Sequence, residues 1–268
     1  MSPPAVRTEA GRAGLAALRA EPHRALVAFD FDGTLAPIVD NPDDARAHPD
    51  VAPLLAELAK QVAQVAIVTG RPAETAVDYA GIADVPGLVV LGHYGLQRWE
   101  DGRLSTPAPD DGVAKARALL SDLLDDLQAP DGTVIEDKGQ ALAVHVRRTA
   151  DPQGAYDLLT APMAMLAART GLTVEPGRYV LELRPAGFDK GRALRVLAHD
   201  ADAGSVTFFG DDLGDLAAFE AVAGLRAAGT PGLLVCSGSD EVPELARRAD
   251  VVVDGPEGVV DFLRTLLG

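Results

Sequence analysis

Two aspartates, Asp30 and Asp32, have the spacing that points most directly to chemistry. They follow the apolar run Ala25 to Phe29, which predicts a buried strand of a parallel sheet, and they precede Gly33. Ligands bind at the carboxyl ends of such strands, and residues two apart point the same way, so both carboxylates can reach one site. Such a pair favours a divalent cation such as Mg²⁺, which accepts protein carboxylates together with phosphate oxygens. The alternative is an ordinary strand followed by a turn, because Asp and Gly are common in turns.

A second strand end carries a hydroxyl group and a glycine. The apolar run Val65 to Val68 ends in Thr69, Gly70 and Arg71. A hydroxyl followed by a glycine at this point suits a phosphate oxygen, because the side chain and the open backbone both donate hydrogen bonds. A simple strand-to-helix turn is the alternative. Arg71 is a candidate either to orient this loop by bonding a carboxylate or to contact the substrate.

Charged residues gather again in the last third of the chain. Lys190 opens a predicted helix, where a cation is unfavourable to the helix dipole, and this favours a function for Lys190 over simple solvation. The predicted strand Ser205 to Phe209 runs into GDDLGD, which places Asp211 and Asp215 at its carboxyl end. Asp212 is interpreted as a turn or cap residue rather than a ligand.

The elements that must position these residues alternate between strand and helix. Apolar runs predict further strands at Leu88 to Leu91, Leu233 to Val235 and Val251 to Val253, and helices from Val51 to about Val62 and from Val259 to Leu267. This rhythm predicts a doubly wound α/β fold with a parallel sheet. Asp50 is expected to cap the helix that begins at Val51.

A stretch of different character lies between the two halves of this sheet pattern. It is predicted to contain a helix followed by two strands, twice over: Val113 to Leu127, Thr133 to Asp137, Ala141 to Arg147, Pro152 to Thr170, Leu172 to Glu175 and Tyr179 to Arg184. Such hairpins favour an antiparallel sheet with helices on one face. We therefore predict an α+β domain at 109–185, inserted into a catalytic domain formed by 1–108 and 186–268, with hinges that let it act as a lid.

Composition limits the class of protein. The chain has 268 residues, one cysteine and a formal net charge of −16 at pH 7. One cysteine excludes an intramolecular disulfide and a multi-cysteine zinc site, and the acidic balance argues against nucleic acid or an anionic membrane as partner. No run approaches the roughly 20 apolar residues that span a bilayer, and the N-terminus lacks the apolar core of a secretory signal. The expected compartment is the cytoplasm.

Together these motifs resemble the haloacid dehalogenase (HAD) superfamily of phosphotransferases, with its Rossmann-like core. The finer pattern is similar to the trehalose-6-phosphate phosphatases: FDFDGTLAPI, VTGR, E-x-K with H-x-R, ELRPAGFDKG and GDDLGD. The inserted unit also resembles that family's cap domain. The likeness implies a Mg²⁺-dependent phosphoric monoester hydrolase of trehalose biosynthesis, which acts on trehalose 6-phosphate through an aspartyl-phosphate.

The resemblance also implies roles for the candidate residues. Asp30 would attack phosphorus and stay ionised beforehand, whereas Asp32 would hold a proton and give it to the leaving sugar oxygen. Thr69 and Lys190 would bind the transferring phosphoryl group. The implied Mg²⁺ ligands are Asp30, Asp32 through its backbone carbonyl, Asp211 and Asp215.

Sugar recognition would fall to the inserted unit, since the sheet site reads only phosphate. Carboxylates and cations that hydrogen-bond hydroxyl groups make a missing hydroxyl costly. The substrate-binding candidates are Glu136, Lys138, Arg147 and Glu182, with Arg71 from the sheet domain. Exposed strand faces are the alternative for the four residues of the insert. The chain departs from the family at Gln97, where a glutamate is common, and this puts one sugar contact in doubt.

Two classes of function stay open at this stage. As an enzyme, the chain has alternative substrates among other phosphorylated glycosides, such as glucosyl- or mannosyl-glycerate phosphate or sucrose phosphate. As a binding protein, it would be a non-catalytic sensor of sugar phosphates, although a pure binder needs no general acid and both Asp30 and Asp32 are present. The expected partner is a small sugar phosphate, without nucleic acid or membrane, and a monomer is the working expectation.

Overall fold

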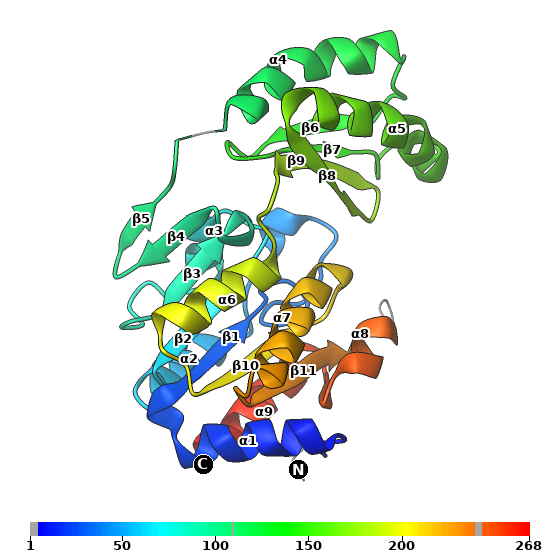
Figure 1. The fold of residues 1–268 in the computed structure, drawn as a ribbon. Helices are drawn as coiled ribbons and strands as arrows, with labels where there is room; N and C mark the ends of the chain where they lie inside the picture. The colour runs from blue at the N-terminus through cyan, green and yellow to red at the C-terminus, as the bar shows by residue number, and fades with distance from the viewer. Residues whose placement is uncertain (1–4, 109, 239–242) are drawn as a thin grey trace. The chain divides into compact units, whose positions relative to one another are not determined.

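The run that ends at Asp30 forms strand β1 (Ala25–Phe29), inside an eight-stranded sheet. The computed structural model of the chain describes residues 5–108, 110–238 and 243–268. The other strands of this sheet are β2 (Gln64–Val68), β3 (Val89–Gly92), β4 (Gln97–Glu100), β5 (Arg103–Ser105), β10 (Ser205–Gly210), β11 (Gly232–Gly238) and β12 (Val251–Asp254). Their order is β12-β11-β10-β1-β2-β3-β4-β5, and all neighbours from β12 to β3 pair in parallel (Figure 1). The predicted α/β fold with a parallel sheet is confirmed.

Helices cover both faces of this sheet. They are α1 (Glu9–Ala20), α2 (Val51–Ala59), α3 (Ala73–Ala80), α6 (Lys190–Asp200), α7 (Leu216–Ala227), α8 (Pro243–Arg248) and α9 (Gly255–Leu267). In β1, Ala25, Val27 and Phe29 pack in a core with α1, α2, α3 and α9, whereas Leu26 and Ala28 pack in a second core with α6, α7 and α8. Since strand residues alternate between faces, two cores fix the position of β1 and of the aspartates that follow it. Within the described ranges, no helix is both long and apolar enough to cross a membrane.

Strands β4 and β5 form an antiparallel edge that the sequence did not predict. The four residues of β4 include one apolar side chain, Trp99, which is buried while its neighbours are partly exposed. Strand β4 lies between β3 and the edge strand β5, and an antiparallel strand needs only one covered face, so it leaves no continuous apolar run in the sequence. The antiparallel edge extends the sheet next to β3.

The expected cap at Asp50 is wrong. Helix α2 begins at Val51 and ends at Ala59, but the Asp50 side chain makes no capping hydrogen bond. The backbone of Asp50 is already helical (φ −86°, ψ −3°), whereas a capping residue is normally extended. Its carboxylate accepts a hydrogen bond from the guanidinium of Arg264 instead, which joins α2 to α9.

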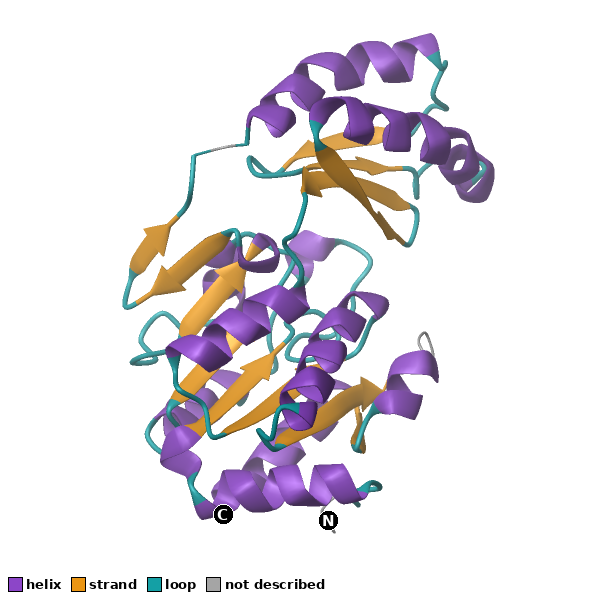
Figure 2. Cartoon of the chain, viewed as in Figure 1, coloured by secondary structure: helices purple, strands orange, loops and turns teal. Residues whose placement is uncertain are grey.

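Residues Pro107–Gly187 form a second compact unit, separate from the unit of Met1–Thr106 and Phe188–Gly268. The smaller unit contains α4 (Asp111–Asp126), β6 (Val134–Asp137), β7 (Leu142–His145), α5 (Pro152–Thr170), β8 (Leu172–Gly177) and β9 (Val180–Pro185). Its strands pair in antiparallel fashion in the order β6-β7-β9-β8, and both helices pack on one face (Figure 2). The predicted repeat of helix, strand and strand is confirmed, while its role as a lid stays a prediction.

Candidate functional site

Three neighbouring strands, β10, β1 and β2, end in buried polar side chains. Asp211 follows β10, Asp30 follows β1 and Thr69 follows β2, and all three side chains are almost completely buried. The three strands are parallel and adjacent, so their carboxyl ends lie at the same edge of the sheet. Residues that are far apart in the sequence are thereby brought to one place.

Lys190 lies at the first position of α6, with its side chain only 4% exposed. Its Nζ atom is 2.8 Å from Asp30 Oδ1 and 2.8 Å from Asp215 Oδ1. Lys190 is therefore not a solvated residue of the first helical turn. Two carboxylates offset the unfavourable interaction of its ammonium group with the helix dipole.

Two glycines allow the acidic loop to approach the end of β1. Gly33 has a φ of +72°, and a Cβ atom there would lie 2.0 Å from Asp211 Oδ2. At Gly210, a Cβ atom would lie 2.5 Å from the Asp215 carboxyl carbon. Asp215 Oδ2 in turn accepts hydrogen bonds from the backbone N–H groups of Asp211 (2.9 Å) and Asp212 (3.2 Å). Asp215 thus holds the loop that carries Asp211 and Asp212.

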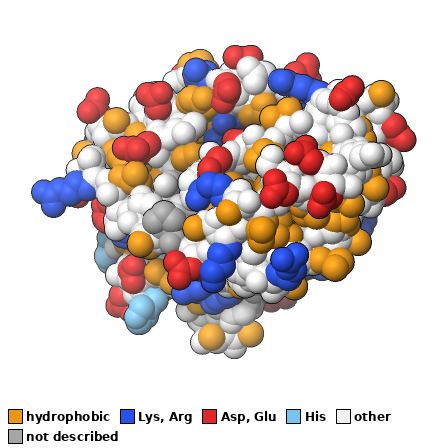
Figure 3. All heavy atoms as spheres, turned by 90° about the horizontal axis from the view of Figure 1, so that it is seen from above, with side chains coloured by type: hydrophobic (Ala, Val, Ile, Leu, Met, Phe, Trp, Pro, Cys, Tyr) orange, Lys and Arg blue, Asp and Glu red, His pale blue; other side chains and the backbone are white. Residues whose placement is uncertain are grey.

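At the carboxyl ends of β1 and β10, three buried carboxyl groups (Asp30, Asp211 and Asp215) face one buried ammonium group, that of Lys190. On the surface shown in Figure 3, by contrast, acidic and basic side chains are interspersed. Burial raises the pKa of Asp30 well above its ordinary value; Lys190 offsets part of this shift, and neighbouring carboxylates add to it. Burial, reinforced by Asp215 and Asp212, raises the pKa of Asp211 to about 8. Burial also raises the pKa of Asp215 to about 6, against the opposing charge of Lys190. The site has an excess of negative charge that a cation would compensate.

Burial lowers the pKa of Lys190, but Asp215 and Asp30 outweigh this effect. The net result is a pKa well above the ordinary value of lysine. Lys190 therefore carries its charge at neutral pH.

Asp32 lies in a different environment from Asp30. Its side chain is 42% exposed and pairs with Arg71 in a bidentate contact: Nε lies 2.7 Å from Oδ2, and Nη2 lies 2.7 Å from Oδ1. The sequence had predicted a protonated Asp32 beside an ionised Asp30. Burial raises the pKa of Asp30, and the Asp32 carboxylate is paired with a guanidinium, so that assignment of the proton stays a prediction.

Carboxylate oxygens of Asp30, Asp212 and Asp215 lie within 4.8 Å of one another. A donor set made only of oxygens fits a hard cation such as Mg²⁺. Asp212 was interpreted from the sequence as a turn or cap residue rather than a ligand, yet its carboxylate belongs to this group. It does act as a cap, in a reciprocal pair with Asp215, but its side chain also joins this cluster. Two consecutive aspartates after a strand give no sequence signal for which of them faces the site.

Gln97 has a structural role in the larger unit. Its Oε1 atom accepts a hydrogen bond of 2.9 Å from the backbone N–H of Ala73, at the start of α3. The first N–H groups of a helix have no partner within the helix, so this bond satisfies one of them. The residue at which the chain departs from the family pattern therefore anchors β4 to α3.

One face of the smaller sheet is polar, and the other packs on its helices. On β7, Leu142 and Val144 belong to the core with α4 and α5. Ala143 points to the opposite face, where it pairs with Glu136 on β6 and with Glu182 on β9. The two carboxylates therefore share one face of the sheet.

Lys138 lies between these two carboxylates. Its Nζ atom is 2.5 Å from Glu182 Oε2 and 4.0 Å from Glu136 Oε2, while His145 Nε2 lies 2.8 Å from the same Glu136 oxygen. The other oxygen of Glu182, Oε1, is buried and has no hydrogen-bond partner among the described residues. An unpaired buried acceptor is costly, so it is a natural place for a ligand hydroxyl group. Arg147 is exposed and donates a long hydrogen bond (3.5 Å) to the carbonyl of Arg178, so the structure does not join it to the other three.

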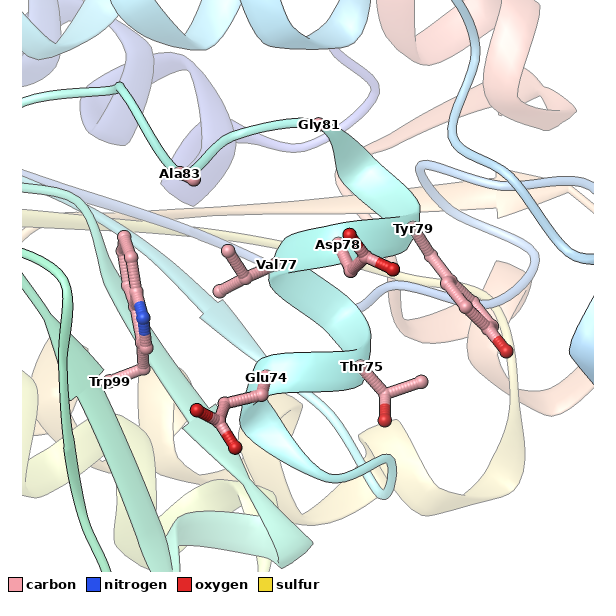
Figure 4. Close-up of a pocket in the computed structure, with 8 residues that line it drawn as sticks. All are labelled: Glu74, Thr75, Val77, Asp78, Tyr79, Gly81, Ala83 and Trp99. Atoms are coloured by element: carbon pink, nitrogen blue, oxygen red, sulfur yellow. The ribbon is translucent and has the colours of Figure 1, made fainter.

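A hollow of about 620 Å³ lies elsewhere on the larger unit (Figure 4). It is formed by α3 and β4, and its lining includes Glu74, Asp78, Tyr79 and Trp99. None of the aspartates at the ends of β1 and β10 lines it. We therefore place the candidate active site at the buried charged side chains and not in this hollow.

The trehalose-phosphatase family matches the chain over residues 28–251. The trehalose-phosphate phosphatase of Mycobacterium avium is 35% identical over 250 residues, which cover 90% of this chain and 61% of that protein. An uncharacterised glycosyl hydrolase of Mycobacterium tuberculosis is 37% identical over 212 residues, which cover 74% of this chain and 15% of that protein. The chain thus spans less than two thirds of the length of both relatives.

The fold also matches solved structures. The C-terminal domain of the C. albicans trehalose-6-phosphate phosphatase superposes with a TM-score of 0.77 and 20% sequence identity. The match covers 100% of this chain and 99% of that domain. At this level of identity the likeness shows the fold alone.

Proposed function

Since the chain belongs to the trehalose-phosphatase family, we propose that it hydrolyses trehalose 6-phosphate to trehalose and phosphate. The observation that carries this proposal is the 2.8 Å contact between Lys190 Nζ and Asp30 Oδ1 at the carboxyl end of β1. Attack on a phosphoryl group brings two negative charges together, and a buried cation beside the nucleophile offsets that repulsion. The arrangement therefore suits phosphoryl transfer to Asp30.

The reaction has two steps in this proposal. First, a carboxylate oxygen of Asp30 attacks phosphorus, the bond between phosphorus and the sugar oxygen breaks, and Asp32 gives its proton to that oxygen. Second, Asp32 takes a proton from water as the water oxygen attacks the aspartyl-phosphate. The bond from phosphorus to Asp30 then breaks, phosphate leaves, and both carboxyl groups return to their starting state.

The other groups hold the phosphoryl oxygens and the cation. Thr69 and Lys190 would donate hydrogen bonds to the phosphoryl group, whose charge they stabilise most in the transition state. The oxygens of Asp30, Asp212 and Asp215 would hold Mg²⁺, together with Asp211 and the backbone carbonyl of Asp32 as the resemblance implies. When bound, Mg²⁺ would neutralise charge on the carboxylates and on the phosphoryl oxygens.

Removal of divalent metal with EDTA should abolish turnover, and added Mg²⁺ should restore it. We also expect Mg²⁺ to stabilise the protein more at pH 8 than at pH 6. The pKa values of Asp211 (about 8) and Asp215 (about 6) are raised above the ordinary 3.8, so the metal-free protein binds more protons when folded than when unfolded. Its free energy of unfolding therefore falls as the pH rises from about 4 to about 8.

Mg²⁺ must displace these protons, so its affinity should rise with pH, by up to about tenfold per pH unit below the pKa of each carboxyl group that loses a proton. The measurement is the melting temperature with and without Mg²⁺ at both pH values. An Mg²⁺-induced increase that is equal at the two pH values, or larger at pH 6, would contradict this assignment of the metal site.

The polar face of the smaller unit is the proposed site of sugar recognition. Glu136, Lys138 and Glu182 lie together on it, and the unpaired Oε1 of Glu182 would accept a hydrogen bond from a sugar hydroxyl group. Arg71 and Arg147 were further candidates for substrate contact, and their roles stay predictions. In this proposal the smaller unit acts as a cap that selects the sugar.

Replacement of Glu182 by Gln should raise the KM for trehalose 6-phosphate by about tenfold, because a charged acceptor for a hydroxyl group is lost. Hydrolysis of p-nitrophenyl phosphate, which has no sugar, should change by less than about twofold. Glu175→Gln is the matched control, because Glu175 pairs with Glu182 across β8 and β9 but its carboxylate contacts Arg184. Equal losses with both substrates would mean that Glu182 supports the fold and does not select the sugar.

The experiment that tests the proposed function is a substrate panel. Phosphate release with Mg²⁺ is measured from trehalose 6-phosphate, glucose 6-phosphate, sucrose 6-phosphate and glucosyl- and mannosyl-glycerate phosphates. A preference for trehalose 6-phosphate supports the proposal. Preference for another glycoside would keep the chemistry and replace the substrate, and turnover of none would favour the non-catalytic sensor.

A further inference from the structure

The pair between Arg71 and Asp32 links two strand ends. Asp32 follows β1 and Arg71 follows β2, and both carboxylate oxygens accept a hydrogen bond of 2.7 Å from the guanidinium. The Arg71 side chain is 14% exposed, against 42% for Asp32. The more buried Arg71 therefore fixes the more exposed Asp32, whose side chain makes no other hydrogen bond among the described residues.

Arg71 is itself held from several directions. Its guanidinium carbon lies 5.5 Å from the centre of the Phe31 ring and 5.3 Å from that of Tyr79, distances typical of cation–π contacts. Its backbone N–H donates to Thr69 Oγ1 (3.1 Å), and its carbonyl accepts a hydrogen bond from His93 (3.0 Å). The position of the guanidinium is thus set before any ligand binds.

We propose that Arg71 is a positioning residue that acts through Asp32, by holding the carboxyl group that exchanges protons with the sugar oxygen and with water. The inference rests on the proposed function, in which Asp32 is the acid and base. Of the two roles that the sequence left open for Arg71, bonding a carboxylate and contacting the substrate, the inference takes the first. Two guanidinium nitrogens of Arg71, Nε and Nη2, donate to the Asp32 carboxylate, one to each oxygen.

A proton-transfer group needs such a support because its rate depends on where the carboxyl group points. Asp32 is partly exposed, so its side chain would otherwise be free to rotate in solvent. A planar guanidinium fixes both oxygens at once, which an ammonium group cannot do. The role of Arg71 therefore requires the planar shape of its guanidinium group as well as its positive charge.

Replacement of Arg71 by Ala should lower kcat for trehalose 6-phosphate by about 100-fold and change KM by less than about threefold. Guanidinium chloride at non-denaturing concentration should raise kcat of this variant by at least about tenfold, because the free ion can occupy the space beside Phe31 and Tyr79. Arg71→Lys should retain the fold and still lose about tenfold in kcat. Arg46→Ala is the matched control, since Arg46 stacks on the same Tyr79 ring at 4.1 Å and should leave kcat unchanged.

A double-mutant comparison separates positioning from substrate binding. In an Asp32→Asn background, further removal of Arg71 should change the residual hydrolysis of p-nitrophenyl phosphate by less than about twofold, because the partner is already altered. A higher KM with unchanged kcat, a further loss in the Asp32→Asn background, or wild-type kcat in Arg71→Lys would overturn the inference. If wild-type protein turns over no phosphorylated glycoside, the proposed function itself fails, and that outcome is seen before any variant is compared.

Discussion

Replacement of Asp30 by Asn should lower kcat for trehalose 6-phosphate by about 10⁴-fold or more. The amide cannot attack phosphorus as the carboxylate does, so the aspartyl-phosphate cannot form and both steps of the reaction are lost. The side chain keeps its size, and Lys190 keeps its second partner, Asp215, at 2.8 Å. The measurement is phosphate release at saturating substrate, with a melting curve to confirm that the variant is folded.

The matched control for this variant is Asp40→Asn. Asp40 lies in the loop after β1 and is exposed, so the same chemical change there should leave kcat within about twofold of the wild type. A folded Asp30→Asn variant that retains more than about one hundredth of the wild-type rate would exclude Asp30 as the nucleophile. Equal losses in both variants would point to a general effect of removing negative charge.

Replacement of Lys190 by Met should have the second-largest effect, with kcat lowered by about 10³-fold. The ammonium group contacts both Asp30 and Asp215, so its removal leaves two buried carboxyl groups without the cation that offsets their charge. Breaking a buried ion pair in this way costs about 3–5 kcal/mol in the free energy of unfolding. Phosphate release and denaturant unfolding of the metal-free protein measure the two effects.

The loss of stability in Lys190→Met should depend on pH. The pKa values of Asp215 (about 6) and Asp211 (about 8) mean that these carboxyl groups take up protons as the pH falls, and a neutral carboxyl group needs no cation. The variant should therefore lose less stability at pH 5 than at pH 8. Arg195→Met, an exposed change on the same helix, should cost little at either pH. A loss that is larger at pH 5, or equal in the two variants, would contradict this account.

The central strand could be predicted because its burial has one simple cause. Every residue of β1 is covered by one of two cores, which leaves a short continuous apolar run in the sequence. Strand β4, which lies between β3 and the edge strand β5, has one buried residue among four, so its mixed composition gave no comparable signal. The inserted unit was predicted for a different reason, since its hairpins and amphipathic helices, which have their own core, break the alternation of strand and helix on either side.

The site was harder to predict because its decisive features depend on side-chain orientation. The sequence identifies Asp211 and Asp212 as neighbours, but only the fold shows that Asp212 joins the cluster with Asp30. Asp32 and Arg71 are 39 positions apart, and their pairing depends on two adjacent parallel strands ending at one edge. The burial that raises the pKa of Asp30 likewise comes from the assembled sheet.

The most direct test of the central claim is phosphate release from trehalose 6-phosphate by the wild-type protein and by Asp30→Asn, in the presence of Mg²⁺. We expect catalytic turnover by the wild type and a loss of about 10⁴-fold or more in the variant. No turnover by folded wild-type protein, or a rate that is the same in both, would contradict the claim that this chain is a phosphatase with Asp30 as its nucleophile.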